Sequence, residues 1–279
     1  MREHGLAGRG RRRRARGGRG AAQARRLTRS RRPEARRRRA RADPRDADGD
    51  DISGRVNVAW DEALQQFAVG RFGWKASVPS LLQQTAGAYN GDMGVTTSLF
   101  PAESCEEYRP DRCGRHRAEV DDETVAAAAF YTQTLGVPAR RRLDDPQVRG
   151  GEAIFYGLGC SGCHTPTLIT VARPGLPAAT AGQVIHPYTD LLHHDMGPAL
   201  ADGRPDFGAS GSEWRTPPLW GIGLVGVVNG HTNFMHDGRA RSLLEAVLWH
   251  GGEATRARED VKAMSARKRA SLVAFLESL

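Results

Sequence analysis

Apolar positions in the second half of the chain recur at the spacing of an amphipathic helix, in segments separated by glycine and proline. A carboxylate that can cap a helix precedes two of these segments, at Asp121 or Asp122 and at Asp145, and Pro146 opens the second one. No stretch approaches the roughly eighteen apolar residues of a membrane-spanning helix. The pattern predicts a mainly α protein with helices over residues 124–131, 146–159, 243–249 and 261–276.

Residues 55–115 show little periodicity and are rich in glycine, proline and aromatic residues. We expect a loop-rich layer there with a few short helices, for example over residues 79–87. Cys105 and Cys113 enclose a seven-residue stretch that contains Pro110. In an exported protein two thiols so close together would form a disulfide, and two free thiols are the alternative.

Charge is distributed unevenly along the chain. Residues 1–45 hold nineteen arginines and three acidic residues, a net charge of +16; since the whole chain carries +9, residues 46–279 carry −7. Such an arginine-rich tail buries too little apolar surface to offset its ordering entropy, so we expect it to be disordered, or else to be a mistaken start or an out-of-frame translation. No aromatic residue interrupts the tail and no nucleic-acid module follows it, so nucleic acid is not an expected partner.

One short motif carries most of the chemical information. Cys160-Ser161-Gly162-Cys163-His164 has the Cys-x-x-Cys-His pattern that attaches c-type haem, in which two thiols bind the porphyrin and the imidazole coordinates its iron. A zinc site would need a second ligand pair, and a thioredoxin-like motif would need a strand before it, where residues 150–159 favour a helix. We therefore predict one covalent haem c held by Cys160, Cys163 and His164, in a cytochrome c-like domain with long loops.

The second axial ligand of the iron sets the potential and decides whether an open site is left. His250 stands out because it closes the helix expected over residues 243–249 and precedes Gly251-Gly252, a helix stop. Met196 is a rival as a thioether ligand on a loop, whereas Met235 is expected to pack against the porphyrin. A capping or hydrogen-bonded histidine is the commoner outcome, so the choice stays open. The candidates are His186, His193, His194, Met196, His231, Met235, His236 and His250.

Several segments resemble known haem enzymes. Residues 214–223, 236–240 and 244–252 resemble the carboxy-terminal haem domain of bacterial di-haem cytochrome c peroxidases. The likeness is closer to the di-haem oxidoreductase branch often called thiol oxidoreductases, and it covers essentially everything after the arginine-rich tail. The segments that resemble this branch are residues 46–57, 71–76, 187–197 and 249–254.

The resemblance implies a distal ligand. In the peroxidases an axial methionine lies fourteen residues after the histidine of a His-Asp-Gly motif, and the residue fourteen after His236 is His250. The resemblance therefore implies that His164 and His250 form a bis-imidazole pair, and imidazole in place of a thioether implies a haem of lower potential. It also divides the chain into the tail of residues 1–45, a loop-rich helical region over residues 46–140 and a cytochrome c-like haem domain over residues 141–279.

Relatives carry an earlier Cys-x-x-Cys-His domain whose haem is expected to meet peroxide, and this sequence contains one such motif. We expect a family member that begins after its first haem domain and that works as the electron-transfer half of a peroxidase-type oxidoreductase, with no catalytic residue of its own. A mono-haem electron carrier without peroxidase activity is the alternative. Cys160 and Cys163 would be consumed as thioethers, so dithiol catalysis is not predicted. The expected partner is a redox protein that donates or accepts electrons.

An acidic loop follows the tail. Asp46, Asp48 and Asp50 stand at alternate positions, as in a calcium loop, but Asp51 occupies the place of the usual glycine and no glutamate stands at the twelfth position. Calcium bound by these three residues and a solvated acidic turn both stay open.

Haem chemistry also indicates a location. Haem is attached to Cys-x-x-Cys-His outside the bacterial cytoplasm, and a Cys105–Cys113 bond would need an oxidising compartment. We therefore expect a periplasmic protein, although no apolar run of a secretory signal follows the basic stretch.

Overall fold

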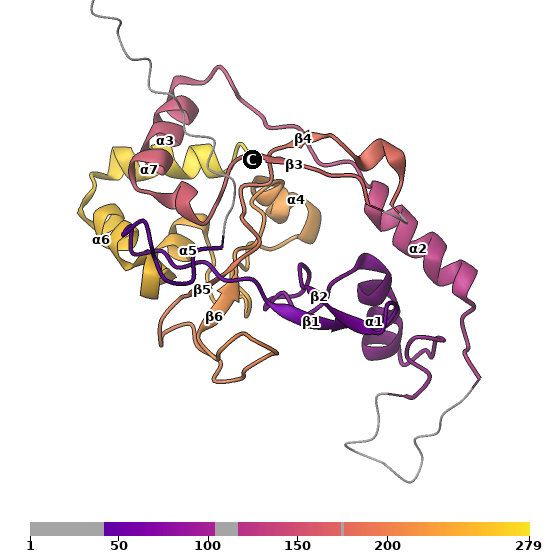
Figure 1. Ribbon diagram of the computed structural model, residues 1–279. Helices are drawn as coiled ribbons and strands as arrows, with labels where there is room; N and C mark the ends of the chain where they lie inside the picture. Colours follow the sequence, from indigo (N-terminus) through magenta and orange to yellow (C-terminus); the bar gives the residue numbers. More distant parts are fainter. Residues whose placement is uncertain (1–41, 104–116, 174–175) are drawn as a thin grey trace, which may run out of the picture. The chain divides into compact units, whose positions relative to one another are not determined.

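Helices make up most of the regular structure in the computed structural model, which describes residues 42–103, 117–173 and 176–279 (Figure 1). Seven α-helices and six short strands occur in these residues, so the expected mainly α fold is confirmed. None of these helices is long and apolar enough to cross a membrane. The expectations for residues 1–41 and for the Cys105–Cys113 pair lie outside the described residues. The helices are α1 (Leu81–Met93), α2 (Asp122–Thr134), α3 (Pro146–Gly157), α4 (Val225–Asn229), α5 (Leu243–Trp249), α6 (Thr255–Ala263) and α7 (Ala266–Leu276).

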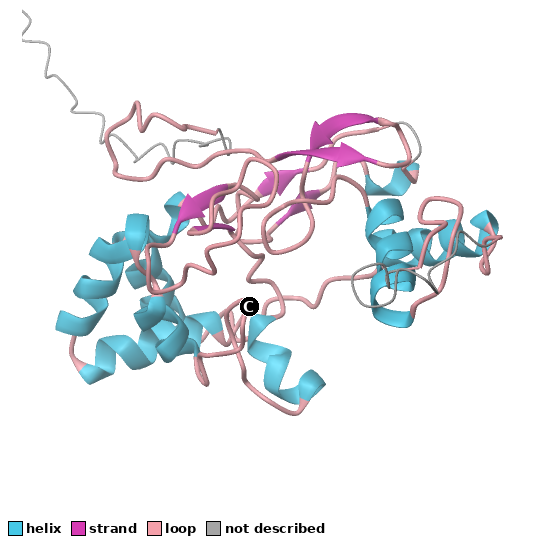
Figure 2. Ribbon diagram, turned by 90° about the horizontal axis from the view of Figure 1, so that it is seen from below, coloured by secondary structure: helices cyan, strands magenta, loops and turns pink. Residues whose placement is uncertain are grey.

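The six strands form three separate antiparallel pairs, drawn in magenta in Figure 2. Arg55 extends the third pair through an isolated bridge to His193, with backbone hydrogen bonds of 3.0 and 2.8 Å between the two residues. The loop before β1 therefore lies against β5, far away in sequence. The pairs are β1 (Val58–Asp61) with β2 (Gln66–Val69), β3 (Leu168–Ile169) with β4 (Val184–Ile185), and β5 (His193–Asp195) with β6 (Glu213–Arg215).

Local signals in the sequence determine where α2 and α3 begin. The side chain of Asp121 accepts a hydrogen bond from the backbone N–H of Thr124 at the start of α2. Asp145 accepts one from Gln147 at the start of α3, whose first residue is Pro146. Both caps lie at expected positions, because a carboxylate satisfies a helix N–H that has no partner inside the helix.

Two helical segments differ from the prediction. α1 continues through Gly87 and also contains Gly91, since each interior glycine costs a helix only about 1 kcal/mol, and it ends where Gly94 adopts a left-handed φ of +69°. The single helix expected over residues 261–276 is two helices, α6 and α7. Between them Met264 is extended, and the Ser265 side chain accepts a hydrogen bond from the backbone N–H of a residue in the first turn of α7. A serine cap therefore starts a second helix at a place where apolar spacing alone predicted a single continuous helix.

α3 and α7 form the main helix pair and lie side by side in Figure 1. Phe155 on α3 and Phe275 on α7 are buried with ring centroids 5.2 Å apart, and the Tyr188 ring lies 5.9 and 5.8 Å from them. Gly151 permits this approach, because a Cβ built on it would lie 1.9 Å from a backbone carbonyl oxygen of α7. The Phe155 ring centroid is 6.3 Å from that of His164, so the core borders the Cys-x-x-Cys-His motif.

Candidate functional site

The Cys-x-x-Cys-His motif directly follows α3. Gly159 takes a left-handed φ of +79° after the helix, and a short 3-10 helix over Cys160–Gly162 carries the first thiol. The backbone N–H groups of Cys163 and His164 both donate to the Cys160 carbonyl, so the two thiols and the imidazole start from one tight turn. A helix leads into the motif, which favours haem attachment over the thioredoxin-like alternative.

His164 is oriented by the backbone. Its Nδ1 donates to the Tyr188 carbonyl oxygen at 3.0 Å, which leaves Nε2 with its lone pair. Burial, assisted by the neighbouring His250, lowers the pKa of His164 to about 4. The ring is therefore neutral near pH 7, the form in which imidazole binds a metal ion.

His250 lies at the carboxy-terminal end of α5 and is held in the same way. Its Nδ1 donates to the Ala246 carbonyl oxygen at 2.8 Å, and burial lowers its pKa although this hydrogen bond opposes the shift. The ring centroids of His164 and His250 are 6.4 Å apart, with 47° between the planes. When two imidazoles bind the same metal ion from opposite sides, with nitrogen–metal distances of about 2 Å, their ring centroids lie roughly 6 Å apart. The centroid separation of the pair is therefore close to that of two histidines bound to one metal ion.

Three other candidate histidines from the sequence have partners of their own. Met196 follows β5 directly, and its backbone N–H donates to the Ser212 carbonyl at 3.0 Å. His236 stacks on Trp214 with ring centroids 3.6 Å apart. His193 Nε2 lies 2.6 Å from the Lys75 carbonyl oxygen, and His186 Nδ1 lies 3.0 Å from Thr167 Oγ1. Among the candidate histidines of the described residues, His250 is the one with a ring contact to His164.

Close backbone packing holds the segment that follows His250. Gly252 has a φ of +52°, and a Cβ on it would lie 2.0 Å from the Asp195 carbonyl oxygen. A Cβ on Gly251 would lie 2.8 Å from the Met196 carbonyl oxygen. The glycine pair expected as a helix stop therefore also lets this segment pack against the end of β5.

A buried cluster of charged groups lies between the segments of the two histidines. His194 Nε2 is 2.9 Å from Asp190 Oδ2 and His194 Nδ1 is 2.8 Å from Glu253 Oε2; the three side chains are 3%, 4% and 13% exposed. Burial alone lowers the pKa of His194, but hydrogen bonds to Asp190, Cys163 and Glu253 outweigh it and raise the pKa to about 12. The sequence predicted His194 only as a candidate iron ligand and gave Asp190 and Glu253 no role.

The charge on His194 predicts how stability depends on pH. The pKa of His194 in the folded protein lies above the ordinary value of 6.5. Its contribution to the free energy of unfolding is therefore complete below about pH 6.5. Above that pH the ring is neutral in the unfolded chain, so folding must take up a proton. Stability should therefore fall as pH rises from about 7 to about 9, by up to ~1.4 kcal/mol per pH unit. Burial raises the pKa of the adjacent Cys163 thiol and keeps it protonated in this range.

Urea unfolding across that pH range measures the slope in the wild type and in His194→Gln. The variant should lose most of it, because Asp190 and Glu253 then face no titrating imidazole. An unchanged slope would show that His194 is not the group that takes up the proton.

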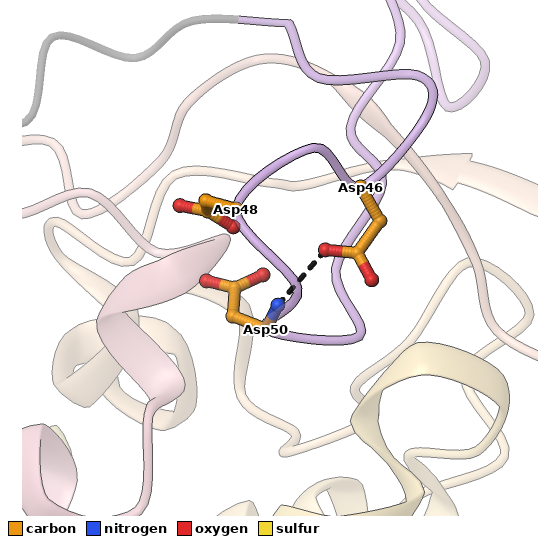
Figure 3. Close-up of side chains that lie close together, drawn as sticks. All are labelled: Asp46, Asp48 and Asp50. Atoms are coloured by element: carbon orange, nitrogen blue, oxygen red, sulfur yellow. Dashed lines mark hydrogen bonds between the residues drawn. The ribbon is translucent and has the colours of Figure 1, made fainter.

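The acidic loop brings its three carboxylates together, as Figure 3 shows. One oxygen from each of Asp46, Asp48 and Asp50 lies within 4.8 Å of the others. The backbone N–H groups of Asp50 and Asp51 donate to the two oxygens of Asp46 at 2.9 and 3.1 Å. This turn satisfies Asp46 by itself, so the geometry is compatible both with a calcium site and with a solvated acidic turn.

Comparison with known proteins gives one match. A family model described as "Di-haem oxidoreductase, putative peroxidase" matches residues 33–279. No curated protein and no solved structure matches the chain. The matched range includes the motif, both oriented histidines and the charged cluster.

Proposed function

The chain belongs to the di-haem oxidoreductase family, whose members are haem-containing oxidoreductases, and we propose that it is a c-type haem protein that transfers electrons within a di-haem, peroxidase-type oxidoreductase. The observation that carries the proposal is the pair of histidines. His164 belongs to a Cys-x-x-Cys-His motif, and its ring lies 6.4 Å from that of His250. In both residues a backbone carbonyl accepts from Nδ1, which leaves Nε2 for a metal ion.

Four residues are assigned to the haem in this proposal. Cys160 and Cys163 would form the thioether bonds, and His164 and His250 would bind the iron. A haem held in this way supplies one-electron transfer. Because two protein imidazoles would hold the iron, the group would supply electron transfer rather than peroxide binding, and electron transfer is the function that this set of residues supports.

We further propose that residues 141–279 form a cytochrome c-like haem domain, after a loop-rich region over residues 46–140. The support is the packing of α3, which leads into the motif, against α7 through Phe155 and Phe275. This packing places a rigid helix directly before the thiols.

The proposed location is the periplasm, and the proposed partner is a redox protein. The support for the location is chemical: haem is joined to Cys-x-x-Cys-His outside the bacterial cytoplasm. A buried bis-imidazole site can exchange electrons with a docked partner without binding a substrate. The mono-haem electron carrier is kept as the second candidate, because the sequence contains one Cys-x-x-Cys-His motif.

A peroxide assay separates the two candidates. The protein purified from its native cells should show a c-type haem spectrum. Under the first candidate it should oxidise a reduced electron carrier with peroxide only together with a second haem whose iron is open, because the two histidines would close the iron held by this chain. Electron exchange with the carrier without peroxide turnover would favour the mono-haem carrier. A purified protein without any c-type haem spectrum would contradict both.

We also propose that the acidic loop binds calcium through Asp46, Asp48 and Asp50. Calcium at 100 times its dissociation constant should stabilise the fold by about 2.7 kcal/mol, measured as a rise in the unfolding temperature. Asp48→Asn should abolish the rise, while Asp92→Asn, at an exposed position on α1, should keep it. No rise in millimolar calcium would leave the loop as an acidic turn.

A further inference from the structure

We infer that Asp190, His194 and Glu253 form an ion triad that positions the distal histidine, His250, for the haem. In this inference, which rests on the proposed haem site, His194 is a positioning residue rather than a ligand. Removing it would free the segment of His250 while leaving Cys160, Cys163 and His164 intact.

The hydrogen-bond partners of the His194 ring determine its protonation state. Both of its nitrogens lie at hydrogen-bond distance from a carboxylate, 2.9 Å to Asp190 and 2.8 Å to Glu253. An ionised carboxylate can only accept, and a neutral imidazole has one N–H, so two such bonds need the doubly protonated ring. A cation between two carboxylates is also how a buried charge is kept paired.

Asp190 connects the triad to the Cys-x-x-Cys-His motif. Its backbone N–H donates to the carbonyl oxygen of Cys163 at 3.0 Å, and the N–H of Thr189 donates to that of Thr165 at 3.0 Å. These two bonds enclose His164. One end of the triad is therefore fixed to the attachment motif.

Glu253 connects the triad to the segment of His250. It lies three residues after His250, on the segment whose glycines pack against β5. Its Oε1 accepts from Ser53 Oγ at 2.6 Å and from the Asp195 backbone N–H at 3.2 Å, and its Oε2 accepts from the Ser53 N–H at 3.0 Å. Every oxygen of this carboxylate is thus engaged, and the segment has little freedom to move.

Through the triad, the motif and the distal segment therefore share one charged cross-link. If the imidazolium is removed, two buried carboxylates face each other without a cation, and they repel. The segment of Glu253 can relieve this repulsion by moving away from Asp190, and it would take His250 with it.

His194→Gln in the haem-loaded full chain tests the inference, with His193→Gln as the matched control. His193 is adjacent on β5 and equally buried, but its Nε2 bonds the Lys75 carbonyl and no carboxylate. His194→Gln should raise the high-spin fraction of the ferric spectrum several-fold, and added imidazole should reverse this. His193→Gln should keep the low-spin spectrum, whatever stability it loses.

If His194→Gln does not fold, Glu253→Gln serves as the second variant and should also raise the high-spin fraction. In the haem-loaded wild type, reduced to its diamagnetic low-spin ferrous form, nitrogen-15 NMR should detect two protonated ring nitrogens in His194 and one in each of His164 and His250. A single protonated nitrogen in His194 would overturn the triad.

A comparison of His250→Ala with His194→Gln separates the ligand assignment of His250 from the positioning role of His194. If His250→Ala loses the low-spin spectrum while His194→Gln keeps it, the ligand assignment holds and the positioning role is wrong. If His250→Ala keeps the low-spin spectrum, the proposed ligand set is wrong, and the triad has no distal ligand to position.

Discussion

Replacement of His250 by alanine should convert the six-coordinate ferric spectrum of the haem-loaded protein into a high-spin one. The reason is local: the Nδ1 of His250 is held by the Ala246 carbonyl at 2.8 Å, and its ring lies 6.4 Å from that of His164. Alanine removes the imidazole and leaves the end of α5 in place. Optical and electron paramagnetic resonance spectra measure the change, which should be almost complete.

Met196→Ala is the control for this prediction, since Met196 is the rival ligand from the sequence. The low-spin spectrum should survive in this variant, and imidazole added to His250→Ala should restore it. His250→Met should raise the reduction potential, because a thioether favours ferrous iron more than an imidazole does. Loss of the low-spin form in Met196→Ala, with retention in His250→Ala, would transfer the ligand to Met196.

Gly151→Ala should destabilise the fold by about 3 kcal/mol or more, the upper range for overpacking of a tight core. A Cβ at this position would lie 1.9 Å from the carbonyl oxygen of Ser271 and 2.8 Å from Phe275 Cβ. The first of these atoms is backbone in α7 and cannot rotate away. The two helices would have to separate, and the contact between Phe155 and Phe275 would weaken.

Gly150→Ala is the matched control, one residue earlier on the same helix. A Cβ there meets no atom within 4 Å. Alanine should therefore stabilise α3 by about 0.5–1 kcal/mol through its higher helix propensity. Urea unfolding of both variants gives the comparison, and equal effects at the two positions would contradict the close approach of α3 and α7.

The sequence predicted features that depend on neighbouring residues. Asp121 and Asp145 mark helix starts because a cap acts within one turn, and the helix before Cys160 follows from apolar spacing. The break at Ser265 was missed, because apolar spacing continues across it. His250 was one of eight candidates until the family resemblance favoured it.

The charged cluster could not be predicted, because its members come from segments far apart in the chain. Glu253 meets His194 across 59 positions and Ser53 across 200. A charge in a sequence does not show whether it will be buried or which partner will neutralise it. The available signal was that Asp190, His194 and Glu253 all fall in segments that resemble the family, 187–197 and 249–254.

A covalent haem on the Cys-x-x-Cys-His motif would change the mass of the proteolytic peptide that contains Cys160 and Cys163, and mass spectrometry measures this change. The peptide from protein purified from its native cells should carry one haem, and neither thiol should react with an alkylating reagent. A peptide without haem, in which both thiols are alkylated, would show that the motif holds no covalent haem.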